Sequence, residues 1–190
     1  MIISTPPVEG ADGHVAEMYA EDLDGDGFVF GYTRAMAVNP DAHAAFMALI
    51  RAIVPSIGVG VYEAATLGAA RAIGSPHCLL AHGRKALRAD VLDDDGLAAF
   101  AVGDDRGFSV AEQAVIRYAA KLSSDPGGMD DGDAQALRDG GFDDRQIVDI
   151  TLAAAARNYF SRALLALAVP TDDVPGLDPR TTAALLRSTV

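Results

Sequence analysis

The chain has 190 residues and a formal net charge of −12, from 15 Lys and Arg against 27 Asp and Glu; half of its residues are hydrophobic and 6% are aromatic. This length fits one domain with a substantial core, and the scarcity of aromatic and β-branched runs favours packed helices over a sheet. The negative surface repels phosphate backbones and anionic lipid, which argues against nucleic acid and membrane partners.

The single cysteine, Cys78, leaves no internal disulfide and suits a reducing compartment. Residues 1–7 lack the basic region and following apolar run of a signal peptide. We also expect no apolar stretch to approach the ~20 residues that span a bilayer. These features predict a cytoplasmic protein.

The first part of the chain combines an extended segment with a short helix. Residues 1–11 are an extended lead-in, and 12–23 has the apolar spacing of a helix. Residues 22–27 alternate aspartates with leucine and glycines, as the start of a calcium loop does. The twelfth position, however, is Thr33 instead of a bidentate glutamate, so we interpret this segment as a solvated turn.

Two apolar helices are predicted before the cysteine. An Asn-Pro pair at 39–40 caps a helix over 41–54, which Pro55 ends, and a second helix covers 59–73. Within the second helix, Glu63 lies among small and apolar residues. It is either a solvent-facing residue of an amphipathic helix or a carboxylate that points into a site, where it orients a group or accepts a proton.

The stretch Gly-Ser-Pro-His-Cys-Leu-Leu-Ala-His at 74–82 has the features of a reactive cysteine. Ser75 and Pro76 predict a helix start, so Cys78 lies in the first turn, where free N–H groups and the helix dipole favour a thiolate. His82 follows four residues later on the same face. A thiol and an imidazole placed in this way can form an activated nucleophile.

Two other interpretations of these residues remain open. A lone cysteine is more often a small buried hydrophobe, and Leu79 and Leu80 show that part of this helix is core. Zinc accepts the ligand types of a glutamate, a cysteine and a histidine, but His77 and His82 lie about 140° apart on a helix and do not easily join one ion.

The remainder of the chain predicts further helices, so the expected fold class is all-α. Two capping boxes, Ser109 with Glu112 and Asp143 with Gln146, open helices. The helix that begins at Asp143 is expected to be the longest, and Pro170 ends it. The predicted segments are 97–102, 110–122, 130–139, 143–169 and 179–187.

These residues resemble a family, the AhpD-like alkylhydroperoxidases of the carboxymuconolactone decarboxylase superfamily. The family pattern is Glu, eleven residues, then Cys-x-x-Cys-x-x-x-His, often with a His before the second Cys. Here Glu63, Ser75, Cys78 and His82 match its spacing, with His77 preceding the cysteine. Weaker similarity extends over 28–170 and includes 141–144 and 158–162, which resemble the closing segment of the peroxidase-related branch.

The resemblance implies a single all-α domain with paired active-site helices, usually in a homo-oligomer, and hydroperoxide reduction with no metal and no organic cofactor. Cys78 corresponds to the cysteine that attacks the peroxide, His82 and Glu63 to the proton relay, and His77 to the neighbouring imidazole. The expected boundaries are 1–27 for the lead-in and short helix, 28–170 for the AhpD-like domain and 171–190 for a tail with a short helix.

The chain departs from the pattern at Ser75, which stands where the family has its resolving cysteine. A serine hydroxyl cannot resolve a sulfenic acid as a disulfide, so a peroxidase of this kind needs an external thiol as reductant. The alternatives are acid–base chemistry like that of the decarboxylase branch, with Cys78 only packing, and a non-catalytic oligomeric member that lost turnover.

Overall fold

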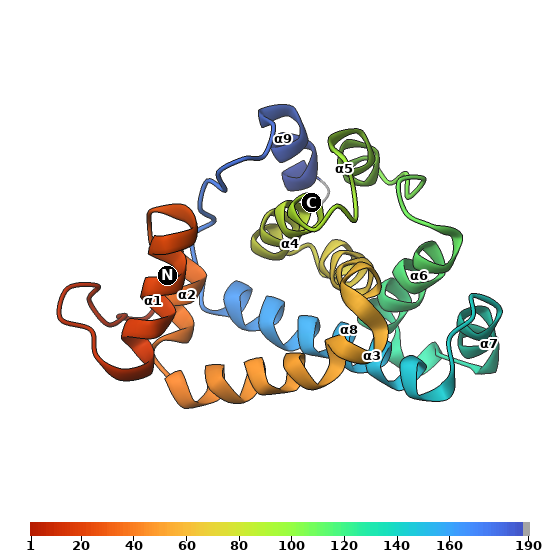
Figure 1. Cartoon of the computed structure of the whole chain (residues 1–190), viewed down its shortest axis with the longest axis horizontal. Helices are drawn as coiled ribbons and strands as arrows, with labels where there is room; N and C mark the ends of the chain where they lie inside the picture. Colours follow the sequence, from red (N-terminus) through yellow and green to blue (C-terminus); the bar gives the residue numbers. More distant parts are fainter. Residues whose placement is uncertain (188–190) are drawn as a thin grey trace.

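The computed structural model describes residues 1–187, and over these the chain is helical without any strand (Figure 1). The predicted all-α fold class is confirmed. The helices are α1 (Gly13–Asp26), α2 (Gly31–Met36), α3 (Pro40–Ile73), α4 (Pro76–Arg88), α5 (Asp94–Ala101), α6 (Val110–Ser124), α7 (Asp131–Asp139), α8 (Asp144–Ala166) and α9 (Pro179–Arg187), with a 3₁₀ turn η1 (Pro126–Gly128).

The predicted capping boxes are present where helices begin. At the start of α6 the Ser109 hydroxyl accepts from the backbone N–H of Glu112, whose carboxylate accepts from the backbone N–H of Ser109. Asp143 and Gln146 form the same reciprocal pair at the start of α8. These contacts satisfy N–H groups that a helix leaves unpaired.

The two helices predicted over 41–54 and 59–73 are present, joined across a kink at Gly58 into the 34-residue element α3. Only the expected end at Pro55 is wrong, because the first of these helices continues through Pro55 to the kink; α8, with 23 residues, is the longest helix without such a break, as predicted. The backbone leaves helical values only at Gly58, with φ 78° and ψ 164°. The carbonyl of Ser56 at this kink accepts from Gln146 Nε2 of α8 at 3.1 Å, so α8 satisfies a group that the kink frees.

The second half of α3 is the centre of the core, packed against α6 and α8. Gly68 makes this close approach possible, because a Cβ there would lie 2.7 Å from the carbonyl oxygen of Ile116 on α6. The run from Tyr62 to Ala70 is buried throughout. Glu63 therefore enters the protein interior with its apolar neighbours.

The first half of α3 is apolar but mostly exposed. By length and composition, α3 is the one described helix that could cross a membrane, with a mean hydropathy of 1.9 over 18 residues of which 11% are buried. The expectation that no apolar stretch reaches this length is therefore wrong, because the helix does not end at Pro55. One helix of this length and composition is weak evidence for a membrane span, and the 18-residue window that meets the criterion is not the buried second half of α3.

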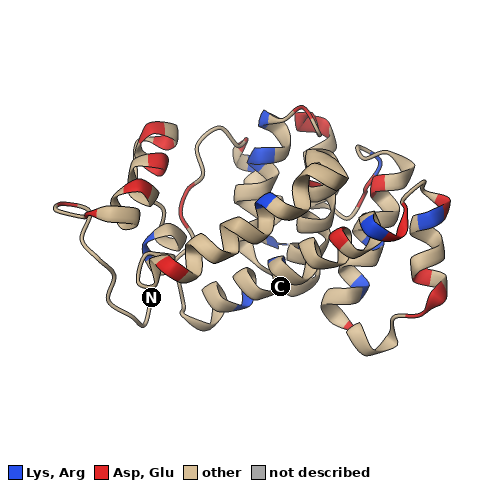
Figure 2. Ribbon diagram, turned by 60° about the horizontal axis from the view of Figure 1, so that its bottom comes forward, with Lys and Arg blue, Asp and Glu red and all other residues tan. Residues whose placement is uncertain are grey.

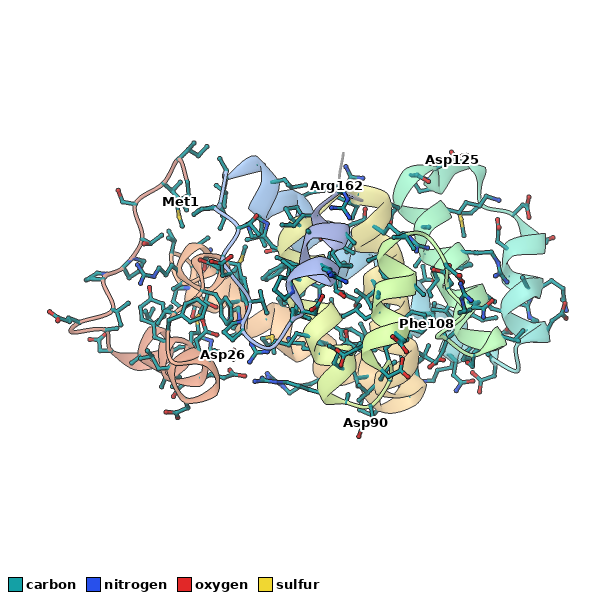
Figure 3. All side chains as sticks on the ribbon, turned by 90° about the horizontal axis from the view of Figure 1, so that it is seen from above. Met1, Asp26, Asp90, Phe108, Asp125 and Arg162 are labelled. Carbon is teal, nitrogen blue, oxygen red and sulfur yellow. The ribbon has the colours of Figure 1, made fainter. Side chains whose placement is uncertain are left out.

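The N-terminal helices α1 and α2 lie together at one end of the molecule, beside the start of α3 (Figure 1). The predicted turn at 22–27 is wrong for most of its length, because α1 continues to Asp26. Asp26, labelled in Figure 3, lies at the end of α1. It forms an ion pair with Arg84 of α4. Helix α2 was not predicted; its first N–H, at Gly31, donates to Asp172 at 2.8 Å.

The short C-terminal helix α9 lies where it was predicted and packs against α4 and α5. Leu185 is fully buried there, 3.5 Å from the position that a Cβ on Gly83 would take. Charged side chains are sparse along the central ribbons and acidic ones gather at the periphery (Figure 2). Among the described residues, the buried charged side chains are Glu63, Arg84, Asp149 and Arg157.

Candidate active site

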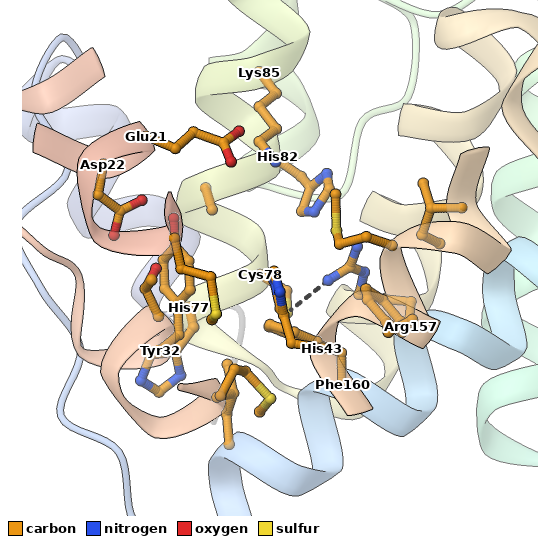
Figure 4. A pocket seen from close by; sticks show the side chains of 18 of the residues that line it. Glu21, Asp22, Tyr32, His43, His77, Cys78, His82, Lys85, Arg157 and Phe160 are labelled. Atoms are coloured by element: carbon orange, nitrogen blue, oxygen red, sulfur yellow. Dashed lines mark hydrogen bonds between the residues drawn. The ribbon is translucent and has the colours of Figure 1, made fainter. Parts of the chain in front are cut away.

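A cavity of about 210 Å³ lies between α1, α2, α3, α4 and α8 (Figure 4). Each of these helices contributes side chains, so the cavity depends on the kink of α3 and on the position of the N-terminal helices. Its apolar wall is rich in methionine and phenylalanine: Met18, Met36, Phe46, Met47, Phe160 and Leu164. Methionine and aromatic surfaces bind apolar, polarisable groups of varied shape.

Cys78 lies at the wall of this cavity, in the first turn of α4, directly after Ser75 and Pro76. Its sulfur is contacted from α8: Arg157 Nη1 donates at 3.5 Å (Figure 4), and Ser161 Oγ donates at 3.1 Å. The residue is only 2% exposed. A helix N-terminus, a hydroxyl and a cation thus all face the sulfur.

Arg157 is a buried cation held by groups of the site. Its Nη2 donates to the Tyr62 hydroxyl at 3.2 Å, and its guanidinium lies 5.5 Å from the centre of the Phe160 ring. Burial opposes its charge, but attraction by Cys78 and Tyr62 outweighs that cost and raises the pKa of Arg157. The guanidinium therefore stays charged beside the thiol.

Glu63 and His82 form a buried pair, with His82 Nδ1 2.7 Å from Glu63 Oε2. Each is 4% exposed, so Glu63 is not the solvent-facing residue that one interpretation allowed. Burial and the charge of Arg157 lower the pKa of His82 to about 4, against the attraction of Glu63. Burial also opposes the charge of Glu63, but attraction by His82, Lys85 and Arg157 leaves its pKa lowered.

The pair is therefore a neutral imidazole and a carboxylate at neutral pH. The Nδ1–H of His82 donates to Glu63, which leaves Nε2 as the free base of the ring. Since His82 also lines the cavity, the structure brings Glu63, Cys78 and His82 to one site, as the spacing led us to expect.

His77 and Ser75 have other surroundings. His77 lines the cavity, but its Nε2 lies 2.9 Å from the carbonyl oxygen of Val169, and its Nδ1 has no hydrogen-bond partner among the described residues. Ser75 occupies the N-cap position without capping, and its buried hydroxyl likewise has no partner in the described part of the chain. The position of the family's first cysteine is thus closed off from solvent.

The outer part of the cavity carries charge of both signs. Glu21 and Asp22 of α1 face Lys85 of α4, whose side chain reaches solvent (Figure 4). His43 also lines the cavity, and its Nδ1 lies 3.3 Å from Nε2 of His14 on α1. No partner for either histidine was recognisable from sequence; the structure pairs them across α1 and α3.

Arg157 and Ser161 are site residues that sequence reasoning missed. Their positions could have indicated this role. Arg157 and Ser161 share a helix face with Ile150, Ala154 and Leu164, so two polar side chains lie on an otherwise apolar buried face. As for metals, the described residues contain no group of three or more His, Cys, Asp or Glu that could hold one. The site offers thiol, imidazole and carboxylate chemistry.

The fold and the cavity define a class of protein: an all-helical domain with a cysteine at a helix start and a Glu–His pair beside it. The sequence model of the Carboxymuconolactone decarboxylase family matches residues 40–121, which include all of these residues. The resemblance of the sequence to the superfamily of carboxymuconolactone decarboxylases and AhpD-like proteins is thereby confirmed. A comparison with curated protein sequences gave no match.

Solved structures share the fold over nearly the whole chain. An uncharacterized peroxidase-related protein from Ralstonia eutropha JMP134, described as an alkylhydroperoxidase AhpD core, has a TM-score of 0.71 at 22% identity, covering 100% of this chain and 96% of its own. One from Silicibacter sp. TM1040 has a TM-score of 0.75 at 19% identity, with 90% and 91% covered.

A third structure with this fold has a different described activity. The debrominase Bmp8 has a TM-score of 0.73 at 20% identity and covers 98% of this chain and 97% of its own. A variant of that debrominase, with one cysteine replaced by alanine, was solved in complex with 2,3,4-tribromopyrrole. The fold is therefore compatible with more than one activity, and function has to be argued from the site.

Proposed function

We propose that this protein is a hydroperoxide reductase that works through one cysteine, Cys78, and is regenerated by an external thiol. The contacts of the sulfur support this proposal most directly: Arg157 and Ser161 donate to it, at the wall of a cavity that it shares with His82. These are the groups that would hold a thiolate and move its proton.

In the proposed reaction, neutral His82 takes the proton of the thiol through Nε2, and Glu63 stabilises the imidazolium that forms. The thiolate attacks one peroxide oxygen, the O–O bond breaks, and the departing alkoxide takes the proton back from His82. The thiol and ROOH become a sulfenic acid and ROH, so cysteine is oxidised and peroxide reduced. His77, whose ring is tied to the backbone at Val169, positions this wall of the site.

Replacement of Cys78 by Ser tests this proposal. We expect the wild-type protein to consume cumene hydroperoxide in the presence of dithiothreitol and the Cys78→Ser variant to lose this activity. Mass spectrometry after stoichiometric peroxide should show a sulfenic acid or a mixed disulfide on Cys78. Ser75→Ala is the matched control and should retain activity, because the Ser75 hydroxyl makes no contact that the reaction uses. A wild-type thiol left unreacted by peroxide would contradict the proposal.

Acid–base chemistry is the second candidate, and the Glu63–His82 pair favours it because it can move protons without the thiol. In that case a lactone or β-keto acid substrate is turned over by Cys78→Ser but not by His82→Gln. A bromopyrrole belongs in the same panel, because a debrominase shares the fold. If peroxide is the only substrate of the panel that the wild-type protein consumes, and both Cys78→Ser and His82→Gln lose that activity, the thiol mechanism is supported.

The Ser75→Cys variant tests whether a cysteine at position 75 can form a disulfide with Cys78. The added sulfur would lie three residues before Cys78, in the Cys-x-x-Cys spacing of the family. We expect peroxide to convert this variant to an internal disulfide, seen as a mass loss of two hydrogens, whereas the wild-type protein needs an added thiol at the same step.

A further inference from the structure

The burial of Cys78 bears on which kind of thiol can restore it. We propose that the reductant is a low-molecular-weight thiol that enters the cavity, and that the thiol of a protein partner cannot reach the sulfur. The role of this thiol in a catalytic cycle rests on the proposed function. The access of small and protein thiols to the Cys78 sulfur is a property of the cavity, and it can be measured separately from any peroxidase activity.

All reducing equivalents must come from outside the chain, because Cys78 is its single cysteine and Ser75 stands at the resolving position. A sulfenic acid on Cys78 reacts with one thiol to give a mixed disulfide and water. A second thiol attacks that disulfide, releases the Cys78 thiol and leaves with the first as a free disulfide. Two external thiols therefore have to reach the same sulfur in turn.

The route to the sulfur is enclosed on several sides. Cys78 is 2% exposed, with Ser161 and Arg157 of α8 against its sulfur. Helices α1 and α2 form the opposite wall of the cavity, through residues such as Met18 and Met36. The Asp26–Arg84 ion pair ties this wall to α4, and the hydrogen bond from Gly31 to Asp172 ties it to the tail.

Disulfide geometry sets how close a partner must come. In a disulfide the two Cα atoms lie within about 7 Å of each other. A protein cysteine would thus bring its own backbone and neighbouring residues almost to Cys78. The cavity of about 210 Å³ is smaller than the roughly 300–1,000 Å³ of pockets that hold drug-sized ligands. It has room for a small thiol and no room for a chain segment.

The experiment loads Cys78 with a small leaving group and compares two reductants. Methyl methanethiosulfonate converts the native thiol to a methyl disulfide without any peroxide step. Release of methanethiol is then timed with dithiothreitol and with thioredoxin, a protein with an exposed dithiol, at equal dithiol concentrations. The matched control is the Cys78→Ser protein that also carries Val110→Cys, because Val110 is 82% exposed at the start of α6.

We expect the ratio of the thioredoxin rate to the dithiothreitol rate to be at least roughly a hundredfold lower for Cys78 than for the exposed control, since exchange depends on access to the sulfur. Equal ratios for Cys78 and the exposed control would overturn the inference. A native Cys78 that reacts with neither methyl methanethiosulfonate nor dithiothreitol would also overturn it. If peroxide fails to oxidise Cys78 while the ratio is low, the proposed function fails and the access inference stands.

Discussion

Arg157 supplies a positive charge to Cys78 from a helix 79 residues further along the chain. The helix start at Ser75 and Pro76 brings partial positive charge to the sulfur, but a full charge in a buried site acts more strongly. The same guanidinium helps to keep His82 neutral. One side chain thus both contacts the sulfur and favours a neutral imidazole, which can accept a proton.

Arg157→Met tests this role, because methionine keeps much of the length of the side chain and removes its charge. We expect the rate of iodoacetamide alkylation of Cys78 at pH 7 to fall about tenfold or more, since a hydrogen bond to a charged group contributes about 1.5–3 kcal/mol. The rate should recover at high pH, where the thiolate forms without help. Arg162→Met is the control, because Arg162 is exposed on the same helix. An unchanged rate in a folded Arg157→Met protein would contradict this role.

Single residues show where sequence reasoning reaches its limit. Glu63, Cys78 and His82 could be predicted as a group because they lie on consecutive helices at a recognisable spacing. Arg157 and Ser161 could not, because they meet the sulfur only through the packing of α8 on the rest of the core. No local pattern states which buried face a distant helix presents.

The elements were predictable wherever their signals are local. Capping boxes fix the starts of α6 and α8, and a proline marks the start of α9. The break in α3 was placed at Pro55 because proline usually ends a helix, whereas the backbone departs from helical values at Gly58, against a hydrogen bond from Gln146. Tertiary contacts determine the position of the kink, and a local sequence pattern does not reveal them.

Gly58→Ala should destabilise the protein through the kink alone. At φ 78° and ψ 164° a side chain is strained, while no described atom lies within 4 Å of the added Cβ. We expect the free energy of unfolding to fall by about 1–3 kcal/mol, measured by urea denaturation. Gly25→Ala is the control: Gly25 is helical, exposed and equally unobstructed, so alanine there should be neutral or stabilising. Equal effects at both positions would show that the kink is not the cause.

For the whole molecule, buried histidines predict loss of stability in acid. The pKa of His82 is lowered to about 4 by burial, and burial together with His14 lowers the pKa of His43; Glu21 and Arg51 also face His43. The unfolded chain binds protons near pH 6.5, so stability is fully present above that pH and is lost as pH falls toward 4. The lowered pKa of Glu63 acts in the same direction below 4.5.

The expected loss for His82 is up to roughly 3 kcal/mol over this whole window. Urea unfolding at pH 7 and pH 5 measures it. His82→Gln should reduce the difference between the two pH values, because glutamine has no proton to gain; His43→Gln should reduce it less. A wild-type protein equally stable at both values would contradict the assignment of His82 as a buried neutral imidazole.

The outer surface of α8 bears on the homo-oligomer that the family resemblance implies. Exposed apolar side chains occur along this helix and also on α3: Val148, Leu152, Tyr159 and Leu165 on α8, and Leu49 and Val59 on α3. Their positions on α8 follow helical spacing, so several share one face. Exposed apolar side chains that share a helix face are typical of subunit interfaces.

We expect the wild-type protein to sediment as an oligomer and Leu152→Arg to shift it toward the monomer, because a charge in the middle of an apolar interface is costly to bury. Leu152 is 40% exposed in the single chain, so the folded subunit itself should tolerate arginine. Val102→Arg is the control, an exposed apolar residue at the end of α5, outside α3 and α8, whose replacement should leave the mass unchanged. Analytical ultracentrifugation over a range of concentrations measures the mass. A wild-type monomer at all concentrations would remove this surface as a subunit contact, and the active site would then have to be complete within one chain.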